Sequence, residues 1–113
     1  MAEGLEIKEY TGDGYKRVVE YKTWTLAFLN WCPEYEKNTY IEAHLETDEV
    51  FVLLTGKATL FIGKNREPVV MEPCKYYNVT AGTYHNIVVS KDARVLVAEN
   101  SDTDKSNTDY IYL

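Results

Sequence analysis

The sequence predicts an all-β fold in which about eight or nine short strands form a sandwich or a closed barrel. Runs rich in β-branched and aromatic residues recur along the chain, and turns containing Gly, Pro, Asn or Asp separate them. In the first two runs, residues 15–21 and 23–31, the apolar residues do not recur at the i, i+3, i+4, i+7 spacing that is typical of an amphipathic helix. Ten tyrosines in 113 residues also suit strands, since Tyr favours extended backbone.

The expected strands follow one another at short intervals along the whole chain. They cover residues 15–21, 23–31, 39–45, 49–54, 58–63, 69–71, 75–79, 83–89 and 93–99, and a terminal strand is suggested within 107–113. Pro33 helps to form the turn between the second and third strands, and residues 34–37 are the one stretch expected to form a short helical turn.

Composition and charge narrow the class of protein. A chain of 113 residues is expected to form a single domain, covering residues 1–113. Its net charge of −6 and its scattered Lys and Arg residues argue against a nucleic acid or an anionic membrane as partner. The N-terminus has no apolar signal sequence, and no apolar run is long enough to span a membrane. A cytoplasmic location is therefore the expectation.

The segment 42–56 contains the most informative polar residues. Side chains alternate between the two faces of a strand, so Glu42 and His44 share one face, and Glu49 shares a face with the apolar residues two and four positions later. These two apolar residues, Phe51 and Leu53, and also Ile87 are interpreted as lining of the barrel. A second segment brings His85, and the chain contains only these two histidines. Three or four ligating side chains are thus expected to converge.

These residues resemble the first conserved motif of the cupin family. That motif has two histidines two residues apart, a glutamate five residues after the second histidine, and a glycine seven residues later. His44, Glu49 and Gly56 occupy the second His, the Glu and the Gly positions, while Glu42 stands where the first His is expected. The first motif therefore covers about residues 42–56, with one substitution.

The second cupin motif is also recognisable, about residues 80–89. Gly82 and His85 match its glycine and histidine, whereas Thr80 and Val89 replace its proline and asparagine. The resemblance implies a single double-stranded β-helix, or jelly-roll, barrel. It also suggests a homodimer, because small cupins are commonly dimers.

The resemblance implies a divalent transition-metal site formed by Glu42, His44, Glu49 and His85. Two imidazoles and carboxylates suit Mn, Fe, Ni or Zn and leave positions open for water or substrate. Glu42 in place of a histidine makes the site more anionic and favours manganese or iron. The alternative is a degenerate site that holds no metal, although a carboxylate buried in the barrel requires a cation or a hydrogen-bond network.

Two classes of function follow from the resemblance. The first is a metal-dependent enzyme, an isomerase or epimerase, a dioxygenase or a lyase, that acts on a small polar metabolite such as a sugar or a carboxylate. Glu42 is then a fourth ligand or a general base, and Tyr40 or Tyr84 is the candidate acid. The second is a non-catalytic module that binds a small molecule in the same barrel, because a fold does not determine a function.

Overall fold

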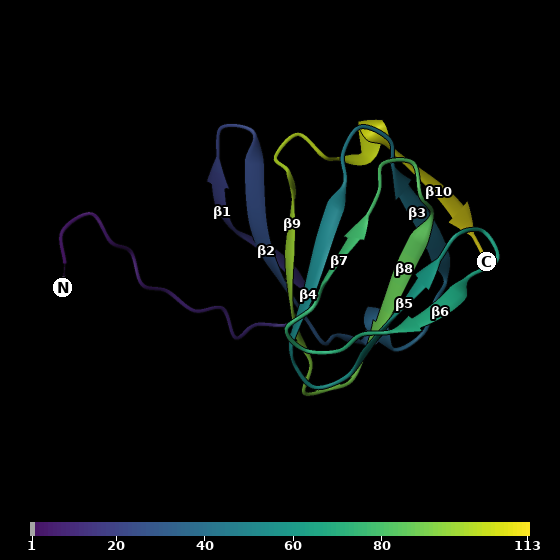
Figure 1. Cartoon of the computed structure of the whole chain (residues 1–113), viewed down its shortest axis with the longest axis horizontal. Helices are drawn as coiled ribbons and strands as arrows, with labels where there is room; N and C mark the ends of the chain where they lie inside the picture. The colour runs from purple at the N-terminus through teal and green to yellow at the C-terminus, as the bar shows by residue number, and fades with distance from the viewer. Residues whose placement is uncertain (1) are drawn as a thin grey trace.

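The structure is a computed structural model that describes residues 2–113, and these form ten β-strands and two short 3-10 helices (Figure 1). The strands are β1 (Tyr15–Tyr21), β2 (Trp24–Asn30), β3 (Tyr40–His44), β4 (Glu49–Thr55), β5 (Ala58–Ile62), β6 (Glu67–Val70), β7 (Tyr76–Val79), β8 (His85–Val89), β9 (Arg94–Asn100) and β10 (Thr108–Tyr112). The helices are η1 (Pro33–Glu36) and η2 (Lys105–Asn107). The all-β prediction and the expected helical turn near residue 34 are confirmed.

The strands form two antiparallel five-stranded sheets that face each other (Figure 1). One sheet has the order β1-β2-β9-β4-β7 and the other has the order β10-β3-β8-β5-β6. Among the described residues, the backbone pairing runs within each sheet, so the barrel is flattened into a sandwich and its rim is not closed by hydrogen bonds. Each sheet consequently ends in free edge strands, among them β1 and β10.

The core lies between the two sheets, where the inward side chains of alternating positions meet. Strand β9 illustrates the pattern, because Val95 and Val97 are fully buried on one face. Phe51 and Leu53 on β4 follow the same alternation and pack in this core. At one end of each of these two strands the inward residue is polar. It is Glu99 near the end of β9 and Glu49 at the start of β4. One end of the sandwich is therefore apolar and the other polar.

The first-motif glycine has a direct structural reason. Gly56 ends β4 with φ of 75°, a conformation that favours glycine, and a Cβ added there would lie 2.6 Å from the Cα of Ala93. Gly82 also has a positive φ, and its N–H donates to the carbonyl of His44 at 2.7 Å. This hydrogen bond ties the second-motif loop to the end of β3, and it brings the two motif segments together.

Residues 2–9 extend away from the two sheets (Figure 1), whereas the carbonyls of Tyr10 and Gly12 accept hydrogen bonds from Asn30 on β2. No helix of the described residues is both long enough and apolar enough to cross a membrane.

Candidate functional site

The structure brings the four predicted ligands together from three strands. Glu42 and His44 lie on β3, Glu49 begins β4, and His85 begins β8. Glu42 on β3 lies directly opposite His85 on β8, and this residue pair joins the two strands. Glu49 belongs to the opposite sheet, so the group is assembled across the inside of the sandwich.

Glu49 lies at the centre of this group. Its Oε1 atom is 2.8 Å from Nε2 of His85 and 3.1 Å from Nε2 of His44. Oε1 of Glu42 lies 3.6 Å from Nε2 of His44. Glu49 and both imidazoles are buried, and Glu42 is half-buried. The expected convergence of the four side chains is therefore present in the geometry.

A fifth polar residue, which the sequence analysis missed, completes the cluster. Glu99 extends from β9 into the same space, and its Oε2 lies 3.9 Å from Nε2 of His44. Its other oxygen, Oε1, accepts a hydrogen bond of 2.7 Å from the hydroxyl of Tyr15 and lies 3.6 Å from the guanidinium of Arg17. The sequence carried one signal for it: Glu99 follows Val95 and Val97 at inward positions of one strand.

The second ring nitrogens of the two histidines have partners outside the cluster. Nδ1 of His85 lies 3.0 Å from the carbonyl of Thr83, which only accepts hydrogen bonds, so Nδ1 carries the proton. Nδ1 of His44 lies 3.0 Å from the hydroxyl of Thr108. These contacts turn the Nε2 atom of each imidazole toward the carboxylates, which is the orientation that a metal ligand requires.

The close packing of charges shifts the pKa values of the histidines and of Glu49. Burial alone would lower the pKa of His85, but the hydrogen bond and charge of Glu49 outweigh it and raise that pKa. Burial would also lower the pKa of His44, but the negative charge of Glu49, whose Oε1 lies 3.1 Å from Nε2, outweighs it and raises that pKa. Burial alone would raise the pKa of Glu49, but the two imidazoles hold it well below its usual range. A cation or a proton is thus strongly favoured between these groups.

The two other carboxylates shift in the opposite direction. Burial raises the pKa of Glu42, because its charged form loses water. Burial and the nearby charge of Glu49 raise the pKa of Glu99 to about 7. Without a cation, Glu42 and Glu99 therefore keep their protons to a higher pH than an isolated carboxyl group does, whereas Glu49 stays ionised.

The donor set fits a divalent metal ion. The buried atoms Nε2 of His44 and Oε2 of Glu99 have no hydrogen-bond partner among the described residues. One ligating atom from each of Glu42, His44 and His85 lies within 4.8 Å of the others, and the same holds for His44, Glu49 and Glu99. Two ligands about 2.1 Å from an ion are about 3.0 Å apart at a right angle and about 3.4 Å at a tetrahedral angle. The contacts measured in the cluster, from 2.8 to 3.9 Å, lie on both sides of these values.

Comparisons with known proteins identify the fold. No protein-family model matches the sequence, and no curated protein matches it. Pac13 from Streptomyces, a nucleoside dehydratase, matches the structure with a TM-score of 0.69 and 9% identity, over 96% of this chain and 93% of that one. The chain of 113 residues printed above has the cupin fold. Variants of PAC13 solved with uridine match equally well.

Two further structures agree with this cupin assignment. A cupin-2 domain protein from Shewanella frigidimarina has a TM-score of 0.65 and 13% identity, covering 80% of this chain and 84% of that one. KdgF from Halomonas sp. has a TM-score of 0.62 and 14% identity, covering 81% of each chain. The fold implied by the two sequence motifs is thus confirmed by structural similarity.

The cupin sandwich holds a cavity of about 350 Å³ directly beside the cluster. Sites for small ligands usually measure about 300–1,000 Å³. All five residues of the cluster line this cavity, and residues from both sheets and both 3-10 helices complete its wall. Of the three apolar residues predicted to line the barrel, Phe51 and Ile87 line the cavity, whereas Leu53 packs in the core. A small molecule therefore has room next to the polar cluster.

The two candidate tyrosines lie in different places. Tyr40 lines the cavity, and its hydroxyl donates to Glu34 at 3.3 Å. Tyr84 is not among the residues that line it, and its hydroxyl donates to Asp109 at an exposed position. The structure thus brings Tyr40 to the pocket and leaves Tyr84 outside it.

Proposed function

We propose that this protein binds a small polar metabolite in the cupin cavity, next to a divalent transition-metal ion held by Glu42, His44, Glu49 and His85, and that it converts this metabolite. When bound, such an ion polarises an oxygen atom of the ligand. The observation that carries the proposal is the convergence of these four side chains, linked by contacts of 2.8 to 3.6 Å, beside a cavity of about 350 Å³. Two imidazoles with two carboxylates suit Mn, Fe, Ni or Zn.

Glu99 is the side chain that we assign to proton transfer. Glu99 lines the cavity, its Oε1 is held by Tyr15, and its buried Oε2 has no hydrogen-bond partner among the described residues. A carboxylate that is anchored through one oxygen presents the other in a fixed place, as a general base or acid requires. Glu42 is then available as the fourth ligand.

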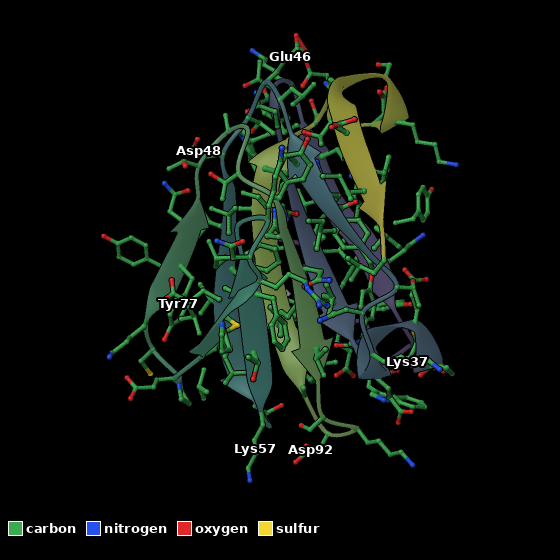
Figure 2. All side chains as sticks on the ribbon, turned by 90° about the vertical axis from the view of Figure 1, so that its right-hand side faces the viewer. Lys37, Glu46, Asp48, Lys57, Tyr77 and Asp92 are labelled. Carbon is green, nitrogen blue, oxygen red and sulfur yellow. The ribbon has the colours of Figure 1, made fainter. Side chains whose placement is uncertain are left out.

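Elemental analysis tests the metal site. The protein is purified without a chelator and without a histidine tag, and its content of Mn, Fe, Ni and Zn is measured before and after reconstitution. We expect close to one equivalent of one metal, and a sharp loss in Glu49→Gln. Glu46→Gln is the matched control, because Glu46 is exposed on the turn just before β4 (Figure 2). Less than about a tenth of an equivalent after reconstitution would rule out the metal site.

The second candidate function is metal-free binding of a metabolite. The contact of 2.8 Å between Glu49 and His85 favours it, because a proton on Nε2 satisfies both atoms as an ion pair without a metal. In that case the reconstituted protein stays metal-free but still binds ligand in the cavity. The elemental analysis separates the two functions directly.

A further inference from the structure

A row of tyrosines continues the polar cluster along the paired strands β3 and β10. In the pairing of β3 with β10, Thr108 lies opposite His44, Tyr110 opposite Glu42, and Tyr112 opposite Tyr40. Directly opposite residues of an antiparallel pair lie on the same face, and successive rows are about 7 Å apart. One wall therefore changes from imidazole to carboxylate to aromatic ring within about 14 Å.

The aromatic part of this wall offers rings to a ligand. Tyr40 and Tyr110 both line the cavity, with ring centroids 5.7 Å apart and planes at 63°. The ring of Tyr112 stacks on that of Tyr110, with the two ring centroids 6.5 Å apart. Tyr112 does not line the cavity, and it is 76% exposed. Partly exposed aromatic rings beside a polar cluster suit the flat or apolar face of a ring-shaped ligand.

The charges around the cavity argue against an anionic ligand. With a divalent ion in place, Glu42 and Glu49 neutralise its charge. The guanidinium of Arg17 is near Glu99 and donates to the carbonyls of Ser101 and Thr103, at 3.0 and 2.7 Å. Its charge is therefore already paired.

The remaining cations of the cavity wall, Lys37 and Lys105, are exposed to solvent, and two exposed carboxylates, Glu34 and Asp104, also line the cavity. Solvent screens charges at such positions. The interior thus offers hydrogen-bond acceptors and an aromatic wall, and none of the described residues that line it supplies a buried, unpaired cation for a phosphate or a carboxylate.

We propose that the metabolite is an uncharged, hydroxyl-bearing ring compound, of the sugar or nucleoside kind, which packs a ring face on Tyr40 and Tyr110 and directs its hydroxyl groups toward Glu42 and His44. This inference rests on the proposed function for the metal ion. Tyr110 is the residue that determines specificity, because it lies opposite Glu42 in the strand pairing and lines the cavity.

Calorimetric titration with two matched pairs of probes tests the ligand class. The pairs are uridine with uridine 5′-monophosphate, and galactose with galacturonate, and each is titrated into the reconstituted protein and into the chelated protein. We expect at least one uncharged member to bind, and its anionic partner to bind at least about tenfold more weakly. The pair that responds identifies the ring as a nucleoside or a sugar.

Substitutions of the tyrosines test the wall. Tyr110→Leu is expected to weaken the uncharged probe at least about tenfold, whereas Tyr110→Phe, which keeps the ring, stays within about threefold. Tyr112→Leu is the matched control, since it removes a ring of the same stack outside the cavity. Metal content and the unfolding midpoint are measured for each variant and should stay unchanged, so that loss of ligand binding is separated from loss of the metal site.

The proposal is overturned if neither uncharged probe binds, if the anionic member of a pair binds more tightly, or if Tyr110→Leu and Tyr112→Leu have equal effects. A protein without metal that still prefers the uncharged probe would contradict the metal site alone. A protein that holds metal but prefers the anion would contradict the ligand class alone.

Discussion

The hydroxyl of Tyr15 donates a hydrogen bond of 2.7 Å to Oε1 of Glu99, and Oε2 of the same carboxylate is left buried without a hydrogen-bond partner among the described residues. The two residues are 84 positions apart in the sequence. One strand at the edge of the sheet thus holds a carboxylate that extends from an inner strand into the cavity. The orientation of Glu99 depends on this contact.

Tyr15→Phe is expected to release Glu99 while keeping the ring in place. Loss of a hydrogen bond to a group that borders a metal typically costs about 10–100-fold in metal affinity or activity, and we expect an effect in this range. Competition with a fluorescent chelator measures the affinity. Tyr21→Phe is the control, because Tyr21 is a solvent-exposed residue of the same strand. Equal affinities of the two variants would contradict the role of Tyr15.

Thr108→Val tests how His44 is oriented. The Thr108 hydroxyl lies 3.0 Å from Nδ1 of His44, and valine has the same shape without the hydroxyl. We expect metal affinity to fall by about tenfold or more, because the imidazole loses the contact that directs its Nε2 atom. Thr59→Val, on β5 in the same sheet, is the matched control and should leave the affinity unchanged. The chelator competition used for Tyr15 also serves here.

The stability of the metal-free protein should fall as pH rises. The folded state raises the pKa of His44 and His85 above 6.5, and that of Glu99 from 4.5 to about 7, so it binds protons more tightly than the unfolded state. Stability from such groups is complete below the unfolded pKa and is lost as pH rises through the folded one. The depressed pKa of Glu49 affects stability only in acid, because the stabilisation by its ionised carboxylate is lost as pH falls below 4.5.

Urea unfolding of the chelated protein at several values between about pH 6 and about pH 8 measures this dependence. We expect the unfolding midpoint to decrease across this range, and Glu99→Gln to reduce the slope. The metal-loaded protein should show the opposite trend, because ligands must lose protons to bind the ion. A midpoint that rises with pH in the chelated protein would refute the proposed charge arrangement.

Gly56→Ala should destabilise the fold more than Gly63→Ala. Both glycines have positive φ, 75° and 80°, so each variant incurs a conformational cost of about 1–3 kcal/mol. Only at Gly56 would the new Cβ collide with a neighbour, 2.6 Å from the Cα of Ala93, whereas the space around Gly63 is open. We expect a further loss of at least about 1 kcal/mol in the free energy of unfolding. Equal losses would show that the close approach is easily relieved.

The fold and the four predicted ligands followed from local patterns. Alternation along β3 and β4 placed Glu42, His44 and Glu49 on inward faces, and the spacing to Gly56 marked the turn that ends β4. The second histidine, His85, was paired with this segment through the resemblance to a cupin. Such features depend on neighbours in sequence or on a known spacing, so the chain itself contains them.

The positions of Glu99, Tyr15 and Arg17 depended on tertiary structure. The alternation of Val95 and Val97 points Glu99 inward, but it does not say which group of the opposite sheet the carboxylate faces. Tyr40 and Tyr84 were equivalent as sequence features, and only the packing of the sheets placed the first in the cavity wall and the second outside it.

The sequence by itself determined the fold class and the polar residues of the two motifs, because strand periodicity and turn residues are local properties. The tertiary structure decided which side chains surround the cavity. That outcome depends on how two sheets of non-consecutive strands face each other, and contacts between residues 84 positions apart leave no local pattern in a single chain.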